Sequence, residues 1–99
     1  MTKEMHNQSI LQAGMSATFD VLNRPKNLAK PPMTDDIGEL YQRADCEMRE
    51  LWEEIYDYYG YGNSDWAKTR AEAGDAIAYL CALIYECDRR LTDEVTRRG

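Results

Sequence analysis

The stretch IGELYQRADCEMRELWEEIYDYYG, residues 37–60, has apolar side chains at every third or fourth position. This spacing places them on one face of an α-helix. Thr34, followed by Asp35 and Asp36, is a good helix N-cap with acidic residues in the first turn. The sequence therefore predicts a long helix that begins after this cap and ends near Gly60.

The segment before this helix predicts a shorter helix followed by a loop. Residues 7–22 have apolar side chains at helical spacing, and the pattern stops at Asn23-Arg24-Pro25. Residues 23–33 contain three prolines and the cations Arg24, Lys26 and Lys30. Proline removes a hydrogen-bond donor and restricts the residue before it, so this segment is expected to be a loop.

The segment after residue 60 predicts a turn and further helix. Tyr61-Gly62-Asn63 is typical of a turn, and Ser64 is expected to cap a helix that runs to about Arg90. Thr92 would cap a short charged helix reaching Arg97. No segment alternates with the period of a strand, which indicates an all-α fold.

The expected architecture is one domain over residues 1–99, because a chain of this length holds a single hydrophobic core at most. It is a small helical bundle whose two long central helices run antiparallel. Its parts are an N-terminal helix with a Pro/Lys loop (1–34), a catalytic helix pair (35–90) and a short C-terminal helix or tail (91–99).

Composition excludes several classes of protein. Eighteen acidic against twelve basic residues give a net charge of -6, which repels nucleic-acid phosphates and anionic membranes. No apolar run approaches the length of a membrane span, and the first residues do not have the layout of a signal peptide. Cys46, Cys81 and Cys87 lack CxxC spacing, which argues against a disulfide framework and a thiolate zinc site. A cytoplasmic location is the expectation.

The acidic residues of the two long helices divide by direction. At about 100° per residue, Glu47, Glu50 and Glu54 lie along one edge of the apolar stripe, together with Arg43. We call such an edge, between the buried and the solvent-facing side of a helix, a shoulder. Glu53 lies on the solvent side. On the following helix, Glu72 and Asp75 also lie on a shoulder, beside Tyr79.

Such shoulders face each other when two antiparallel helices pack, so four or five carboxylates are expected to converge. Like charges raise each other's pKa, and a divalent cation relieves the repulsion. Carboxylates without histidine or thiolate favour Mg²⁺, with Mn²⁺ as a substitute. Because Mg²⁺ usually completes its coordination with waters and phosphates, a phosphate ester is the expected ligand.

Two other interpretations stay open at this point. Acidic pairs such as Glu50-x-x-Glu53 also arise as solvated charge on a helix, and the aromatic residues around the turn suit a docking face. The chain would then be a non-catalytic helical interaction protein. A metal-binding regulatory protein that retains the site without turnover is the other alternative.

The acidic pattern resembles that of the MazG-type all-α nucleotide pyrophosphohydrolases, which carry EExxE on one helix and ExxD on the next. The corresponding residues are Glu47-Met48-Arg49-Glu50 and, after the gap from Leu51 to Ala71, Glu72-Ala73-Gly74-Asp75. Tyr79, four residues after the aspartate, is also similar to the family. The first glutamate of EExxE is replaced by Cys46. The similarity covers about residues 40–88.

The resemblance implies an enzyme that cleaves nucleoside triphosphates, ribo- or deoxyribo-, between the α and β phosphates, giving a monophosphate and pyrophosphate. It implies metal binding by four acidic residues: Glu47, Glu50, Glu72 and Asp75. Arg43 would lie near the phosphates and Tyr79 near the nucleotide. Glu50 is the expected general base, and Glu54 is a possible additional acid.

Two further expectations concern the substrate and the assembly. Arg24, Lys26 and Lys30 are expected to draw a triphosphate toward an otherwise acidic protein, although a solvated loop also carries such charges. Family members pair helices across a dimer or tetramer. Self-association also fits a chain too small to bury both faces of its long helices.

Overall fold

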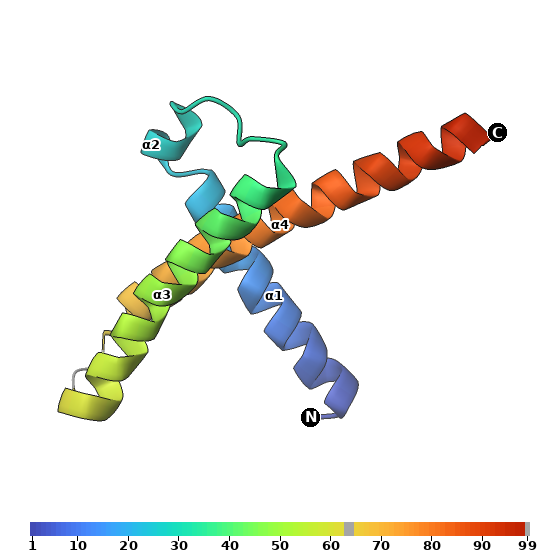
Figure 1. Ribbon diagram of the computed structural model, residues 1–99. Coiled ribbons are helices and arrows are strands. Elements are labelled where there is room, and N and C mark those ends of the chain that lie inside the picture. Colours follow the sequence, from blue (N-terminus) through green and yellow to red (C-terminus); the bar gives the residue numbers. More distant parts are fainter. Residues whose placement is uncertain (63–64, 99) are drawn as a thin grey trace.

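The computed structural model describes residues 1–62 and 65–98, and these residues form helices without strands. The four helices are α1 (Lys3–Leu22), α2 (Pro25–Leu28), α3 (Ile37–Tyr61) and α4 (Trp66–Arg98), shown in Figure 1. The expected all-α class is confirmed, and the two long helices α3 and α4 pack on each other.

The first helix begins earlier than its apolar spacing indicates. Thr2 caps it, because its hydroxyl accepts a hydrogen bond from the backbone N–H of Met5 at 3.1 Å. After Asn23, the chain forms the one-turn helix α2 inside a segment expected to be loop throughout. Pro25 opens this turn, where its missing N–H costs nothing and its φ angle suits a helix.

The helix α3 is capped two residues later than expected. Asp36, not Thr34, is the N-cap, and its carboxylate accepts a hydrogen bond from the backbone N–H of Glu39 at 3.0 Å. The Thr34 hydroxyl instead accepts from the N–H of Asp36. Gly62 ends the helix with a φ of 71°, a left-handed conformation that glycine adopts without steric cost.

The helix α4 differs most from the expectation. The proposed cap Ser64 lies outside the described residues, and the Asp65 carboxylate accepts a hydrogen bond from the backbone N–H of Lys68 at 3.0 Å. The helix continues through Thr92 to Arg98, so the separate C-terminal helix was a wrong prediction. Instead of capping, the Thr92 hydroxyl donates to the carbonyl of Asp88 within the continuing helix.

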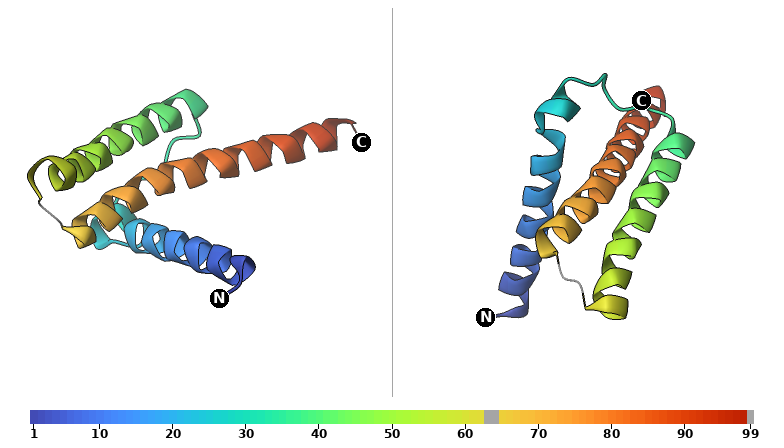
Figure 2. Two further views of the ribbon diagram at one scale, coloured as in Figure 1. Left: turned by 90° about the horizontal axis from the view of Figure 1, so that it is seen from below. Right: turned by 90° about the vertical axis from the view of Figure 1, so that its left-hand side faces the viewer.

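The central helix of the fold is α4, which lies between α1 and α3 (Figure 2). Its 33 residues measure about 50 Å at 1.5 Å per residue, close to the longest extent of the molecule, 56 Å. The buried apolar side chains are mostly small: Ala17, Val21, Leu40, Ala44, Ala76 and Ala78. Small residues let helices approach closely, and Gly74 of α4 packs directly against Ala17 of α1.

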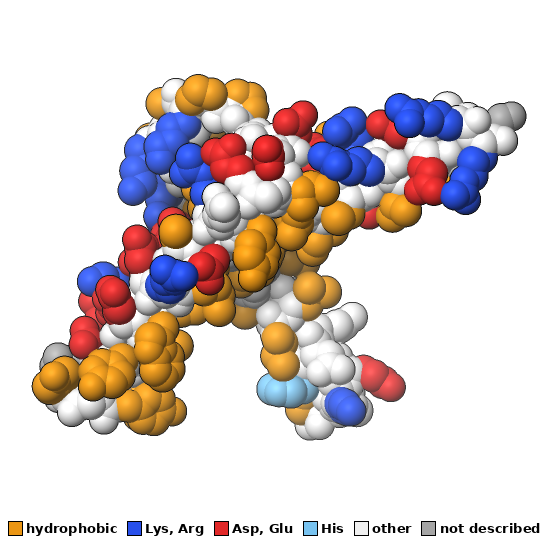
Figure 3. All heavy atoms as spheres, in the orientation of Figure 1, with side chains coloured by type: hydrophobic (Ala, Val, Ile, Leu, Met, Phe, Trp, Pro, Cys, Tyr) orange, Lys and Arg blue, Asp and Glu red, His pale blue; other side chains and the backbone are white. Residues whose placement is uncertain are grey.

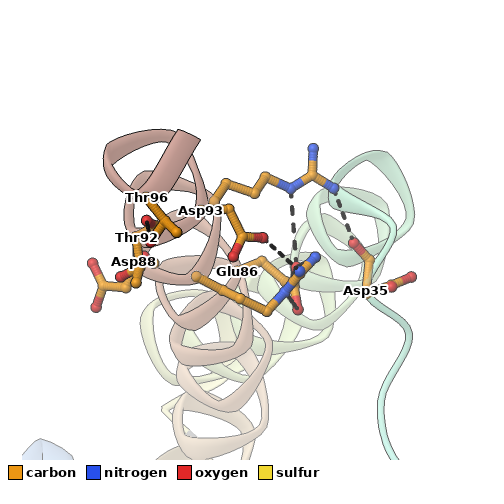
Figure 4. Close-up of polar contacts among 8 residues, drawn as sticks. Asp35, Glu86, Asp88, Thr92, Asp93 and Thr96 are labelled. Carbon is orange, nitrogen blue, oxygen red and sulfur yellow. Dashed lines mark hydrogen bonds and ion pairs between the residues drawn. The ribbon is translucent and has the colours of Figure 1, made fainter. Parts of the chain in front are cut away.

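A buried carboxylate ties the middle of α4 to the start of α3 (Figure 4). Glu86 is only 6% exposed, and Arg89 donates a hydrogen bond to it at 2.9 Å. The neighbouring Arg90 lies 3.9 Å from the same carboxylate and donates to the carbonyl of Asp35 at 3.4 Å. Two cations thus compensate the buried charge, and one of them also binds the segment that leads into α3.

The molecule is open rather than closely packed. Its radius of gyration is 16.4 Å, against about 13 Å for a compact domain of this length. Its accessible surface is 7867 Å², against about 5,800 Å² for a compact monomer of this mass. The N-terminal half of α1 and the C-terminal half of α4 project from the crossing (Figure 1).

Much of the additional surface is apolar. Figure 3 shows hydrophobic side chains along the lower edge of α3 and in the angle between α3 and α1. The large apolar side chains that are exposed on these two helices include Met15 and Phe19 of α1 and Met48, Trp52 and Tyr56 of α3. None of the helices in the described part of the chain is both long enough and apolar enough to cross a membrane.

The close contact at Gly74 predicts that adding a methyl group at this position destabilises the fold. A Cβ at this position would lie 2.9 Å from the Ala17 carbonyl oxygen and 3.0 Å from Val21 Cγ2. Gly74→Ala is expected to lower the free energy of unfolding by about 1–3 kcal/mol, the usual cost of overpacking. The measurement is chemical unfolding followed by circular dichroism.

Gly14→Ala is the matched control for this substitution, because a Cβ there meets nothing within 4 Å. It should leave the protein as stable or slightly more stable, since alanine favours helix over glycine by about 1 kcal/mol. Equal stability of Gly74→Ala and the wild type would contradict the proposed close contact between α1 and α4.

Candidate metal centre

Three carboxylates from the two long helices meet at one point. Glu47 and Glu50 are one turn apart on α3, and Glu72 projects from α4 toward them. Each offers one oxygen, and these three oxygens lie within 4.8 Å of one another. We refer to Glu47, Glu50 and Glu72 as the acidic triad.

The triad is electrostatically unfavourable in itself. The pKa of Glu47 is raised from 4.5 to about 7, by partial burial first and then by the negative charges of Glu50, Asp75 and Glu72. The pKa of Glu72 is also raised, again by burial and then by Glu50 and Asp75. Both shifts mean that burial and neighbouring negative charge disfavour the ionised form of these two carboxyl groups.

The donor atoms of the triad suit a hard divalent cation. The Oε2 atom of Glu72 is buried and has no hydrogen-bond partner among the described residues. A buried acceptor without a partner is costly, and a bound cation would satisfy it. Carboxylate oxygens without imidazole or thiolate fit Mg²⁺ or Mn²⁺.

The other two acids expected at this site each pair with a cation. Asp75 lies next to the triad, but its Oδ1 accepts a hydrogen bond from Arg24 at 3.4 Å. Glu54 forms an ion pair with Lys68 at 2.8 Å, so its negative charge is already balanced by a cation. The structure therefore brings three of the five expected acids together.

A cavity of about 620 Å³ opens beside the triad. Glu47, Asp75 and Tyr79 line its side on the long helices, and Arg24, Lys26 and Lys30 line its side on the α1–α3 connection. Cations gather around α2 in Figure 3, with acidic side chains on the neighbouring part of the α3–α4 pair. The expected substrate residues Lys26, Lys30 and Tyr79 thus share one cavity.

Arg43 lies outside this cavity, in an adjoining groove that it shares with Lys30 and Tyr79. It donates two hydrogen bonds of 3.2 Å to Glu39 one turn earlier, and this contact raises the pKa of the guanidinium. Cys46 is exposed on the same side of α3 as Arg43 and does not join the triad. Glu53 is exposed on a different face, beside Trp52.

Sequence reasoning missed both ion pairs of the site. Lys68 lies one turn before Glu72, so the helical arithmetic that selected Glu72 would also have placed Lys68 on that shoulder. The pair of Arg24 and Asp75 joins residues 51 positions apart, and no spacing rule connects two such elements.

Comparison of the chain with known proteins finds no match among family models, curated proteins or solved structures.

The raised pKa of Glu47 predicts how stability changes with pH. A carboxyl group whose pKa is higher in the folded state stabilises the fold most below its unfolded pKa, 4.5, and this contribution is lost as pH rises to about 7. In chelator, the wild type should therefore lose more stability than Glu47→Gln between about pH 5 and pH 8. Chemical unfolding at the two pH values measures the difference.

Glu53→Gln serves as the control for this measurement, since Glu53 is exposed and outside the triad. It should keep the pH dependence of the wild type. If Glu47→Gln also kept it, the raised pKa assigned to Glu47 would be wrong.

Proposed function

We propose that this protein is a Mg²⁺-dependent nucleotide pyrophosphohydrolase of the MazG type, acting on nucleoside or deoxynucleoside triphosphates. The products would be a nucleoside monophosphate and pyrophosphate. The observation that carries the proposal is the acidic triad, built from the two helices that bear the family-like acidic pattern.

The helix pair supplies the metal ligands in this proposal. Glu47, Glu50 and Glu72 of the packed helices α3 and α4 would hold the metal, and Asp75 would join them in exchange for its ion pair with Arg24. The unpartnered Oε2 of Glu72 supports such a role. When bound, Mg²⁺ neutralises phosphate charge and lowers the pKa of a bound water.

The protein's own residues then position the substrate and move the proton. Glu50 is the exposed member of the triad, and we assign it as the base that accepts a proton from the attacking water. The water oxygen bonds to the α phosphorus while the bond to the bridging oxygen breaks, and pyrophosphate leaves. Lys26, Lys30 and Arg43 hold the phosphate oxygens, and Tyr79 lies beside the nucleoside.

We also propose that the chain self-associates to a dimer or tetramer. The accessible surface exceeds that of a compact monomer by about 2,000 Å², while a typical interface buries about 800 Å² on each partner. Trp52, Tyr56 and Met48 form an exposed apolar stripe on α3. Aromatic residues and methionine are the side chains most enriched at interfaces.

The same stripe supports a second candidate function, a non-catalytic helical interaction protein. In that case the triad is surface charge, or a metal site with a regulatory role and no turnover. Trp52 is 60% exposed and Tyr56 53% exposed, and such side chains suit a docking face. Turnover of a triphosphate distinguishes the enzyme from both alternatives.

The enzyme proposal predicts that Mg²⁺ or Mn²⁺ raises the melting temperature and permits release of pyrophosphate from a triphosphate. Glu50→Gln should lower kcat/KM by at least about 100-fold, because it removes both a ligand and the base. A panel of ribo- and deoxyribonucleoside triphosphates, assayed for pyrophosphate with each metal, measures this.

Glu53→Gln is again the matched control, since it alters a glutamate on the same helix outside the triad. It should retain activity within about twofold, as expected for an exposed position. Metal-dependent stabilisation without turnover of any triphosphate would favour the regulatory alternative, and the absence of both would exclude the metal site.

The self-association proposal predicts that Trp52→Glu shifts the protein toward monomer. A charge within an apolar interface is costly, so the dissociation constant should rise at least about tenfold. Sedimentation equilibrium of the wild type and the variant measures it. A wild type that is monomeric at all concentrations contradicts the proposal.

A further inference from the structure

Arg24 is held by its backbone in the connection between α1 and α2. Its N–H donates to the Val21 carbonyl at 3.3 Å, and its own carbonyl accepts from the N–H groups of Asn27 and Leu28, both at 2.9 Å. The Asn27 side chain adds a hydrogen bond to the Val21 carbonyl at 2.6 Å. The main chain of Arg24 is therefore fixed, while its side chain lines the cavity and reaches Asp75.

The contact that this side chain makes with Asp75 is weak for two opposite charges. A single guanidinium nitrogen reaches a single carboxylate oxygen at 3.4 Å, whereas charge-assisted hydrogen bonds measure about 2.7–2.9 Å and are frequently bidentate. The side chains are 32% and 26% exposed, so water competes for both. Such a pair exchanges partners at little cost.

The cavity around this pair has two walls of opposite charge. Arg24, Lys26 and Lys30 form the cationic wall, and Glu47 and Asp75 form the acidic wall. Among the described residues, the pair of Arg24 and Asp75 is the ion pair that joins them. A phosphate chain carrying a divalent cation is complementary to both walls at once, because its oxygens suit the cations and its metal suits the carboxylates.

We propose that Arg24 is a positioning residue that changes partner when substrate binds. It pairs with Asp75 in the free protein, and it turns to a phosphate oxygen of the substrate when a divalent cation takes Asp75. This inference rests on the proposed function. It makes Arg24 the residue through which binding of the metal affects binding of the phosphates. Arg24 therefore opposes binding of the metal alone and favours binding of phosphate in the presence of the metal.

The two effects have opposite signs, which gives a sharp experiment. With Arg24→Gln, the dissociation constant of Mn²⁺ alone should fall by about threefold or more, because Asp75 loses its competing cation. The dissociation constant of pyrophosphate in saturating Mn²⁺ should rise by about tenfold or more, because one charge-assisted contact is lost. Isothermal titration calorimetry measures both.

Arg70→Gln is the matched control. Arg70 also joins α1 to α4, through an ion pair with Asp20 at 3.0 Å, but it lies outside the cavity and the triad. Its removal should leave both dissociation constants within about twofold. Arg24→Lys keeps the charge. It should change the two dissociation constants in the same directions as Arg24→Gln but by less, so the test remains possible if the glutamine variant folds poorly.

Three outcomes decide the matter. Opposite changes in the two dissociation constants support the exchange of partners. Weaker binding of both probes, or no change in either, overturns it and leaves the proposed function standing if the wild type binds Mn²⁺ and pyrophosphate. A wild type that binds neither probe overturns the proposed function together with this inference.

Discussion

The architecture depends on the close approach of three helices, which small residues on α4 permit. Gly74 leaves room for the backbone of α1, and Ala76 and Ala78 are buried beside it. The same stretch of α4 also carries Glu72, Asp75 and Tyr79. Because helical neighbours point in different directions, one segment packs against its partners and also presents polar groups to the cavity. The packing of α4 therefore also sets the positions of the polar side chains of the site.

Electrostatics explains how an acidic seam is tolerated. Lys68 compensates Glu54, Arg24 compensates Asp75, and Arg89 compensates the buried Glu86. Glu47 and Glu72 have no such partner among the described residues, and the pKa of each is raised. Of the five acids expected at the site, the three of the triad are the ones without an ion pair among the described residues, and a cation there would relieve their repulsion. This distribution supports a metal site more strongly than the count of acidic residues does.

The open shape bears on function as well. A compact monomer would bury the apolar side chains of α1 and α3 that this fold leaves accessible, including Phe19 and Trp52. An unpartnered apolar face is stabilised by association, because burial of each Å² is worth about 25 cal/mol. The proposed dimer or tetramer and the alternative docking role both account for this face, and the oligomeric state in solution separates them.

Local pattern by itself determined that the chain is helical and which faces its acids occupy. Apolar spacing predicted a long helix that ends near Gly60, and residue type predicted the turn at Tyr61-Gly62-Asn63, close to the observed end of α3 at Tyr61. Helical periodicity and turn chemistry are properties of short segments. Helical spacing predicted Glu47, Glu50 and Glu72 on facing shoulders for the same reason. The cap at Asp36 and the unbroken α4 were missed, since several adjacent residues are able to cap and only packing decides among them.

Tertiary structure alone decided the rest of the site. The distance between α1 and α4 depends on the contact of Gly74 with Ala17, and that distance places Arg24 beside Asp75. Likewise, the packing of α4 against α3 brings Lys68 to Glu54 and leaves the triad without a counter-charge. Interactions between different helices, such as that of Arg24 with Asp75 51 positions away, have no period in the sequence, so they are defined only once the helices have packed.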